Sequence, residues 1–260
     1  MKLSIIAPCY NEVENVNKLH DELLPVVEEL VLHGWENAPE KVLSAEIIFV
    51  DDGSRDGTSA KLQEVFFGHN QLGLTFKFLK HETNLGLGAA IRTGFKHADG
   101  DLVVTVDSDG TYKFSEIPAL LACLVPGVDL VTASPYHPQG SVVGVPANRL
   151  ILSRGSSLIY RLLVEWHIYT YTCLFRVYRA DVIQKVCFNA NDFLAGTEIL
   201  VKALLAGYHA TEFPAVLYKR MYGVSKARIA QTIISHLRFQ SWVLLHRLRL
   251  LFGRKLEPAN

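Results

Sequence analysis

The stretch Asp101–Tyr112, DLVVTVDSDGTY, constrains the fold of this chain more than any other part of its sequence. Its first half, residues 102–106, is an apolar run rich in β-branched residues, which is typical of a buried strand in a parallel sheet. The run ends at Asp107-Ser108-Asp109-Gly110. Successive side chains of a strand alternate between its two faces, so we expect Asp107 and Asp109 to point the same way from its carboxyl end.

Two converging carboxylates repel each other unless a cation lies between them. Mg²⁺ and Mn²⁺ prefer oxygen ligands, and a substrate diphosphate would complete the coordination shell of either ion. Asp107 and Asp109 therefore predict a metal site that takes part in catalysis. Taken alone, Asp-x-Asp is more typical of an acidic turn, because Asp, Ser and Gly are common turn residues.

The rest of the chain places this strand in a larger sheet. Further strands are expected at residues 3–7, 46–50, 74–79 and 128–133, and helical periodicity marks residues 16–30, 62–66 and 89–97. This alternation predicts an α/β fold with a mostly parallel, Rossmann-like sheet and helices on both faces. We also expect Asn11 or Asn15 to cap the first helix.

Polar residues follow two of these strands as well. The first strand ends in Pro8-Cys9-Tyr10-Asn11-Glu12, and the second ends in Asp51-Asp52-Gly53-Ser54. In open α/β sheets, ligands bind beyond the carboxyl ends of the strands. Three polar strand ends at one edge are difficult to explain as turn chemistry alone, so the sequence predicts a binding site there.

Composition excludes several other classes of protein. The chain has 260 residues, with 26 Lys and Arg against 26 Asp and Glu, which argues against a nucleic-acid binder. Its four cysteines form no C-x-x-C pair, which predicts reduced thiols in the cytoplasm. No G-x-G-x-x-G follows the first strand and no P-loop motif occurs, so a dehydrogenase or P-loop enzyme is disfavoured. No signal peptide or transmembrane run is predicted.

Taken together, the motifs resemble those of the family 2 glycosyltransferases, which have the GT-A fold. More narrowly, the chain resembles the polyprenyl-phosphate branch, which is similar to dolichol-phosphate mannose synthase. The resemblance covers nearly the whole chain and rests on motifs at residues 8–12, 51–54, 56–58, 84–88, 107–110, 152–155, 175–179 and 223–226.

The resemblance implies a nucleotide-sugar donor, a Mg²⁺ or Mn²⁺ ion held by Asp107 and Asp109, and inversion at the sugar carbon. It also implies which residues bind the donor: Pro8, Tyr10, Asn11, Glu12, Asp51, Asp52, Gly86 and Asp107. Carboxylates at such positions can accept hydrogen bonds from ribose hydroxyls or base N–H groups. GDP-mannose and UDP-glucose both remain possible donors.

The second half of the chain is expected to bind the acceptor. By resemblance, the phosphate of a polyprenyl acceptor would contact Arg149, Ser153, Arg220, Ser225 and Lys226. Arg149 and Ser153 are four residues apart and can face one ligand, although a surface arginine and a polar helix serine explain them equally well.

Pro135 and Glu198 also bear on which acceptor the chain uses. Pro135 stands where the resembled branch usually has an arginine. Glu198 is the best candidate for a base or an organiser of the acceptor site, with a carboxylate at a helix N-terminus as its rival interpretation. Arg176 and Arg179 are interpreted as scaffold residues in salt bridges.

The last segment predicts a long amphipathic helix over residues 227–253. Its apolar face would contain Ile233, Leu237, Leu244, Leu248 and Leu251. A helix on the membrane surface would suit a lipid acceptor, whereas docking on the catalytic domain or on a second copy explains the pattern equally well. We therefore expect a catalytic domain over residues 1–226, this helix, and a disordered tail over residues 254–260.

The hypothesis from sequence is an inverting, metal-dependent glycosyltransferase in the cytoplasm, peripheral on the cytoplasmic membrane face. It would transfer a sugar from a nucleotide-diphosphate sugar to a polyprenyl phosphate. One alternative transfers the sugar to a saccharide hydroxyl in cell-surface polysaccharide synthesis. Alternatives from other classes are a nucleotidyltransferase and a non-catalytic nucleotide-sugar binder.

Overall fold

The computed structural model describes residues 1–36, 38, 41–69, 73–220 and 229–253. The strands are β1 (Lys2–Cys9), β2 (Ser44–Asp51), β3 (Leu74–Lys80), β4 (Leu102–Thr105), β5 (Leu130–Ser134), β6 (Ser141–Val143), β7 (Arg176–Arg179), β8 (Ala210–Pro214) and β9 (Val216–Tyr218). The longer helices are α2 (Leu24–His33), α3 (Thr58–Phe66), α4 (Leu87–His97), α6 (Ala147–Leu163), α8 (Ala195–Leu205) and α9 (Ile229–Gly253). The shorter ones are η1 (Val13–Asn15), α1 (Val16–Lys18), η2 (Leu19–Leu23), η3 (Phe114–Glu116), α5 (Ile117–Ala122) and α7 (Ala180–Lys185).

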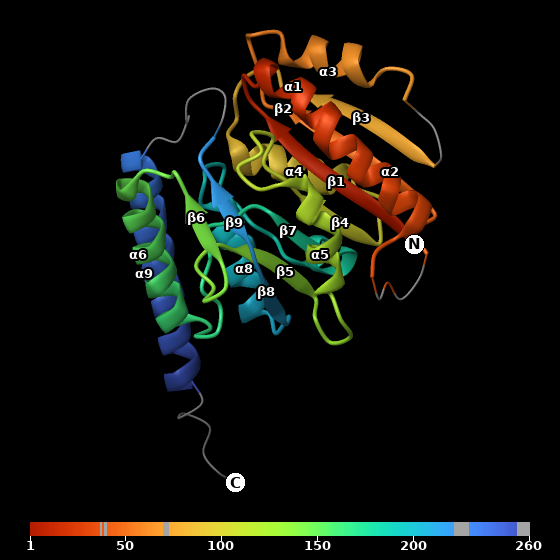
Figure 1. The fold of residues 1–260 in the computed structure, drawn as a ribbon. Helices are drawn as coiled ribbons and strands as arrows, with labels where there is room; N and C mark the ends of the chain where they lie inside the picture. Colours follow the sequence, from red (N-terminus) through yellow and green to blue (C-terminus); the bar gives the residue numbers. More distant parts are fainter. Residues whose placement is uncertain (37, 39–40, 70–72, 221–228, 254–260) are drawn as a thin grey trace.

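The main sheet has seven strands in the order β3-β2-β1-β4-β7-β5-β8. All neighbouring pairs are parallel except those made by β7, which runs antiparallel between β4 and β5. A separate parallel pair joins β6 to β9 (Figure 1). The predicted mostly parallel sheet is therefore confirmed, whereas β6, β7, β8 and β9 were not predicted.

Helices cover both faces of this sheet, as the alternation of side chains requires. Leu3, Ile5 and Ala7 of β1 are buried in the cluster that includes α1, α2 and α3. Ile6, between them, is buried on the opposite face against Ala90 of α4. All residues of β1 and β2 after the first of each strand are buried on one side or the other, which explains the continuous apolar runs in the sequence.

The first helical segment differs from the prediction in its capping. It begins with the 3₁₀ turn η1, continues through α1 and passes through the π-helical turn η2 before α2. Neither Asn11 nor Asn15 caps it through its side chain. The Asn15 amide instead donates to Glu12 Oε2 at 2.6 Å, and Asn11 Oδ1 accepts from the backbone N–H of Arg55 at 2.8 Å.

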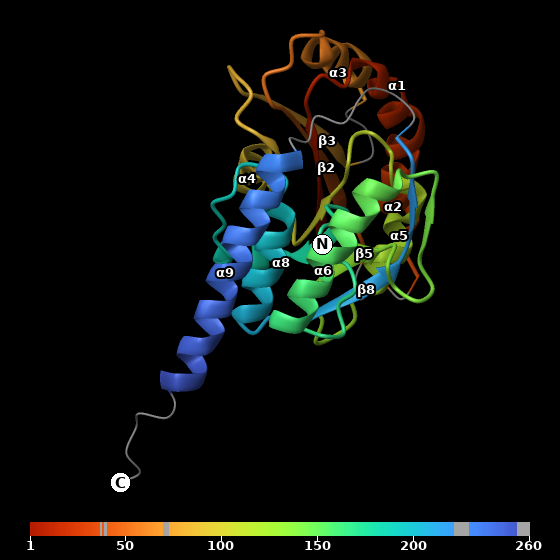
Figure 2. The same cartoon turned by 90° about the vertical axis from the view of Figure 1, so that its left-hand side faces the viewer.

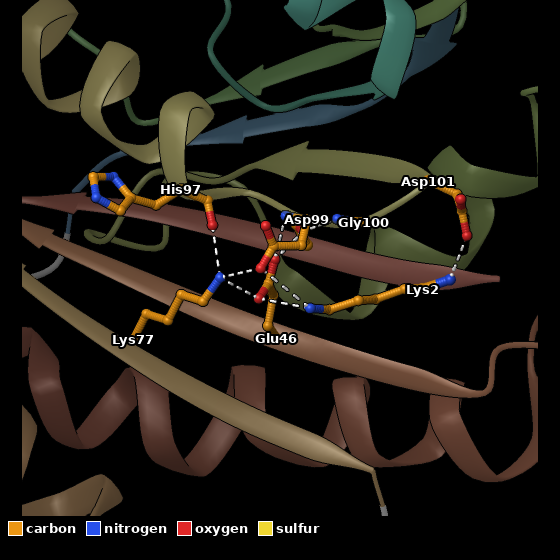
Figure 3. Close-up of polar contacts among 8 residues, drawn as sticks. Lys2, Glu46, Lys77, His97, Asp99, Gly100 and Asp101 are labelled. Carbon is orange, nitrogen blue, oxygen red and sulfur yellow. Dashed lines mark hydrogen bonds and ion pairs between the residues drawn. The ribbon is translucent and has the colours of Figure 1, made fainter.

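A buried ionic cluster lies near the amino ends of β1 and β2 (Figure 3). The Glu46 side chain is fully buried, and its Oε2 lies 3.0 Å from Lys2 Nζ and 2.8 Å from Lys77 Nζ. Its other oxygen accepts from the Ser4 hydroxyl at 2.5 Å and from the Asp99 backbone N–H at 2.8 Å. These contacts join three strands to the loop before β4, and they lower the pKa of Glu46 to about 2 against the cost of its burial.

Helices α6 and α9 lie side by side at one side of the sheet, and α9 extends past the rest of the fold (Figures 1 and 2). The residues of α9 that are buried are His236, Phe239, Gln240 and Val243. The predicted apolar face is largely left exposed, with Leu237 at 55% and Leu244 at 45%, while the side chain of Leu251 lies outside the part that the structure describes. Within the described residues, no helix has the length and hydropathy needed to cross a membrane.

Candidate active site

A large open cleft, of about 1430 Å³, lies beyond the carboxyl ends of β1 and β4 and reaches α6 and α9. Most of the predicted site residues line it: Pro8, Tyr10, Glu12, Asp52, Gly86, Asp107, Asp109, Arg149, Ser153 and Arg220. Asn11, Asp51 and Glu198 are not among the lining residues. Ser225 and Lys226 lie outside the described residues.

Asp107 and Asp109 both line this cleft, and an arginine joins Asp109 to Glu12. Arg220 Nε donates to Asp109 Oδ2 at 2.8 Å, and its Nη2 donates to Glu12 Oε1 at 3.2 Å. Burial and the neighbouring charge of Asp109 raise the pKa of Asp107 to about 7, although Arg220 opposes the shift. The site therefore concentrates negative charge that a cation would stabilise.

The donor set at this point fits a hard divalent cation. Asp107 and Asp109 offer carboxylate oxygens from one short turn, and the Thr111 backbone N–H donates to Asp109 Oδ1 at 3.0 Å and fixes that side chain. Over the residues that the structure describes, no group of three or more His, Cys, Asp or Glu side chains is arranged to hold a metal.

The side chain of Asp52 faces into the protein wall of the cleft. Its Oδ1 lies 2.7 Å from His81 Nδ1 and accepts from the Leu85 N–H at 2.9 Å, while Oδ2 accepts from the Gly86 N–H at 2.8 Å. Asp52 therefore holds the turn before α4. His81 was not singled out in the sequence, where an isolated histidine in a polar loop gives no signal.

Asp51 and Asn11 lie behind the cleft surface. Asp51 Oδ1 accepts from the Ser54 N–H at 2.9 Å, and its buried Oδ2 has no hydrogen-bond partner among the described residues. Asn11 has a φ of 52°, in the left-handed region, and its backbone N–H donates to the Ser54 hydroxyl at 2.8 Å. Both residues thus join the ends of β1 and β2.

The two glycines at the start of α4 are explained by close packing. A Cβ on Gly86 would lie 2.2 Å from the Asn191 carbonyl oxygen, and one on Gly88 would lie 2.0 Å from that of Ala190. The Gly88 N–H donates to the Asn191 carbonyl at 2.9 Å. Residues 188–194, which we call the wall segment, can therefore lie directly against the helix.

Glu198 holds this wall segment from behind. Its Oε2 accepts from the backbone N–H groups of Asn189 and Ala190, at 3.1 and 2.8 Å, and its Oε1 lies 2.6 Å from Lys202 Nζ. The carboxylate does not line the cleft. This placement does not suit the predicted general base. Glu198 stands in the first turn of α8, as its rival interpretation, a carboxylate at a helix N-terminus, describes.

Side chains of α6 form the other half of the cleft. Arg149 is exposed there, and the structure gives its guanidinium no hydrogen bond or ion pair to any described residue. Ser153 lies 2.5 Å from the Thr172 hydroxyl, and Arg154 stacks over Tyr136 at 5.1 Å from the ring centre. Arg149 is thus the cation of this helix that can meet a ligand in the cleft.

Of the two predicted scaffold arginines, Arg176 is in the core and Arg179 is half-buried, and neither forms a salt bridge with a described residue. Arg176 is fully buried and donates to the carbonyls of Gly196 and Tyr171 and to the Thr132 hydroxyl. Arg179 donates to the Val128 carbonyl at 2.8 Å. Carbonyl oxygens replace the expected carboxylates because both side chains lie where loops expose unpaired C=O groups.

Helix α9 contributes polar residues to the cleft that sequence reasoning missed. Ser235 donates to Asp192 Oδ2 at 2.5 Å, which ties α9 to the wall segment. His236 Nδ1 lies 3.1 Å from the Ser156 hydroxyl and 3.2 Å from that of Tyr160, both on α6, and burial lowers its pKa. The heptad-like spacing of leucines drew attention to a different face of this helix.

Comparisons with known proteins agree with this architecture. The model of glycosyl transferase family 2 matches residues 4–187. The chain is 30% identical to the polyprenol monophosphomannose synthase of Mycolicibacterium smegmatis, over 85% of this chain and 79% of that one. It is also 30% identical to the dolichol-phosphate mannosyltransferase of Pyrococcus furiosus, over 92% of this chain, and it spans 62% of that protein's length.

Solved structures show the same fold at lower identity. A glucosyl-3-phosphoglycerate synthase from Mycobacterium tuberculosis, in complex with Mn²⁺, UDP and phosphoglyceric acid, superposes with a TM-score of 0.64 at 17% identity, over 92% of this chain and 78% of that one. Its complex with Mg²⁺ and UDP gives a TM-score of 0.65 at 16% identity, over 92% and 79%. The predicted GT-A type of α/β fold is therefore confirmed.

Proposed function

This chain belongs to glycosyl transferase family 2, and we propose that it transfers a sugar from a nucleotide-diphosphate sugar to a polyprenyl phosphate at a membrane surface. The observation that carries the proposal is the composition of the cleft. One end holds the paired aspartates beside Arg220, and the other end holds the exposed Arg149 next to the apolar faces of α6 and α9.

The donor would occupy the end of the cleft near β1. Pro8, Tyr10 and Glu12 line this part, and Asp51 would support it from behind by accepting from the Ser54 N–H. Asn11 would contribute by shaping the same turn. A mannosyl donor is the first choice, because both named relatives transfer mannose, and GDP-mannose and UDP-glucose are the donors to compare.

Asp107 and Asp109 would hold Mg²⁺ or Mn²⁺ against the donor diphosphate. The ion would neutralise the negative charge that develops on the leaving nucleoside diphosphate. The fold relative that binds UDP with Mn²⁺ or Mg²⁺ makes these two ions the natural ones to test. Arg220 lies within reach of the same charge and would stabilise it further.

A phosphate acceptor suits the arrangement better than a hydroxyl. A phosphate is ionised near neutral pH and needs no general base, whereas an alcohol does. The Glu198 carboxylate, the candidate base, is held by two backbone N–H groups and Lys202 outside the cleft lining. Arg149, with Ser153 one turn further along α6, would bind the acceptor phosphate, and the pair would take the role of the arginine absent at Pro135.

Helix α9 would place the cleft at the membrane surface. Its exposed apolar residues continue those of α6, where Ile151 is 70% and Leu162 is 67% exposed. Apolar surface of this extent on two adjacent helices is unusual for a protein surrounded only by water. A peripheral position on the cytoplasmic face would bring the phosphate of a membrane lipid to Arg149.

The test is nucleoside diphosphate release from a panel of GDP- and UDP-sugars, with Mg²⁺ or Mn²⁺ and with or without a short-chain polyprenyl phosphate. Release that requires the lipid phosphate and is lost in D109N would support the proposal and identify the donor. Release that responds to a saccharide acceptor instead would favour the hydroxyl-transferring alternative. Formation of a nucleoside triphosphate and a sugar 1-phosphate when pyrophosphate is added to the NDP-sugar would favour a nucleotidyltransferase. Binding without any turnover would favour a nucleotide-sugar binder.

A further inference from the structure

The carboxylate of Asp52 forms its hydrogen bonds with other groups of the protein. The residue is 3% exposed, and three donors from one loop meet its two oxygens: the His81 ring, the Leu85 N–H and the Gly86 N–H. An ionised carboxylate can accept about four hydrogen bonds, so most of its capacity is used. Asp52 therefore acts on the cleft mainly through the turn that it holds.

The His81 ring connects this turn to helix α4. Nδ1 lies 2.7 Å from Asp52 Oδ1, and Nε2 lies 2.9 Å from the Thr93 hydroxyl on α4. A carboxylate can only accept, so Nδ1 carries the proton in the first contact. One side chain thus fixes the orientation of Asp52 and attaches it to the helix.

The turn that Asp52 holds forms part of the cleft wall. Asn84, Leu85 and Gly86 all line the cleft, and Gly86 has a φ of 100°, which a side chain would strain. The same turn lies against the Asn191 carbonyl of the wall segment. A small displacement of Gly86 would therefore change the shape of the proposed donor pocket.

We infer that His81 is a positioning residue of the donor site, which holds Asp52 and through it the Asn84–Gly86 turn in the shape that binds the nucleotide. The inference rests on the proposed function, because it takes this end of the cleft to be the nucleotide pocket. It assigns Asp52 an indirect role, in place of the direct contact with ribose or base that the sequence suggested.

Two amide substitutions of His81 separate its two contacts. The Asn amide of H81N reaches the place of Nδ1 and can still donate to Asp52, whereas the Gln amide of H81Q reaches the place of Nε2 and can contact only Thr93. We expect H81N, which loses the contact with Thr93, to bind GDP or UDP about threefold more weakly than the wild type in the presence of Mg²⁺. We expect H81Q to bind the same nucleotide about tenfold to hundredfold more weakly, because a charge-assisted hydrogen bond to a buried carboxylate is lost.

Isothermal titration calorimetry with GDP and UDP gives the affinities, and hydrogen exchange at Leu85 and Gly86 shows whether the turn has loosened. In activity assays, H81Q should raise KM for the donor while KM for the lipid phosphate stays unchanged. Equal affinities for H81N and H81Q would overturn the inference, and so would weak binding by both variants with unchanged exchange at the turn.

A third variant keeps the test decisive if H81Q does not fold. T93V removes only the partner of Nε2, and it is expected to weaken nucleotide binding about threefold; unchanged affinity would then count against the inference. A wild-type protein that binds neither GDP nor UDP with Mg²⁺ would contradict the proposed function instead, so the two failures are distinguishable.

Discussion

Replacing Glu46 by Gln should remove a large, pH-dependent part of the stability of this fold. Glu46 is fully buried between the ammonium groups of Lys2 and Lys77, which lie 3.0 and 2.8 Å from one of its oxygens. The amide of E46Q has nearly the same shape as the carboxyl but carries no charge. It would leave the two ammonium groups beside a neutral group, with the exposed Asp99 as their remaining carboxylate partner.

The magnitude follows from the lowered pKa of Glu46. A fall from 4.5 to about 2 corresponds to about 3 kcal/mol, at about 1.4 kcal/mol for each tenfold change. Because the pKa is lower in the folded state, this stabilisation is fully present above pH 4.5 and is lost as the pH falls through 2. The amide resembles the protonated carboxyl, so E46Q should lack the contribution at every pH.

Urea denaturation of the two proteins measures the difference directly. The free energy of unfolding of E46Q should be about 3 kcal/mol lower than that of the wild type at pH 7, and roughly half of this difference should remain at pH 3. D99N is the matched control, because Asp99 contacts the same Lys77 from an exposed position and should contribute less than about 1 kcal/mol. A difference below 1 kcal/mol for E46Q at pH 7, or one that does not change with pH, would refute this account.

Three further outcomes are expected. R220M should bind Mn²⁺ about tenfold more tightly than the wild type in the absence of nucleotide, because the guanidinium no longer competes for Asp109. Electron paramagnetic resonance measures this affinity, and an unchanged value would contradict the prediction. In the wild type, the affinity for Mg²⁺ should fall by up to about tenfold per pH unit below pH 7. Burial and the charge of Asp109 raise the pKa of Asp107 to about 7, so that protons compete with the metal below this pH. An affinity that stays constant between pH 5.5 and 7.5 in calorimetric titrations would argue against this explanation. The double variant L244Q/L248Q should keep its circular dichroism spectrum but lose most of its sedimentation with anionic lipid vesicles, whereas equal sedimentation would exclude these residues from a membrane contact.

The positions of the strand ends could be predicted from sequence because the apolar runs are so clear. Residues 3–7, 46–50 and 102–106 are buried on both faces, and such runs end where the chain leaves the core. Since parallel strands finish at one edge, their polar ends had to lie together. Asp107 and Asp109 are in the cleft for this reason.

The partners of individual side chains could not be predicted in the same way. Asp52 and Glu198 were interpreted as ligand-binding or catalytic carboxylates, and the structure gives each of them backbone N–H donors from a loop. The loop that serves Asp52 lies 33 and 34 residues further along the chain, and the one that serves Glu198 directly precedes its helix. Strand β7 was missed because Arg176 and Arg179 made its four residues look polar. The sequence pattern does not show that buried carbonyl groups would satisfy those guanidinium groups.

The buried face of α9 could not be predicted from the sequence either. Apolar residues occur on more than one side of this helix, so periodicity offered several faces to bury. Packing against α6 selected His236, Phe239 and Val243, because Ser156 and Tyr160 on that helix provide partners for the imidazole. The leucine face remained exposed as a result.

The wall segment affects how the preferences of such an enzyme for its donor and its acceptor can change in evolution. It contacts the glycine start of α4 on one side and, through Asp192 and Ser235, helix α9 on the other. At Gly88 the backbone of α4 lies directly against the backbone of the wall segment. The wall segment therefore cannot adjust to a change in α9 without also moving the start of α4. Substitutions that adapt α9 to a new acceptor would then also reshape the donor pocket, so that donor and acceptor preferences would tend to be inherited as a pair.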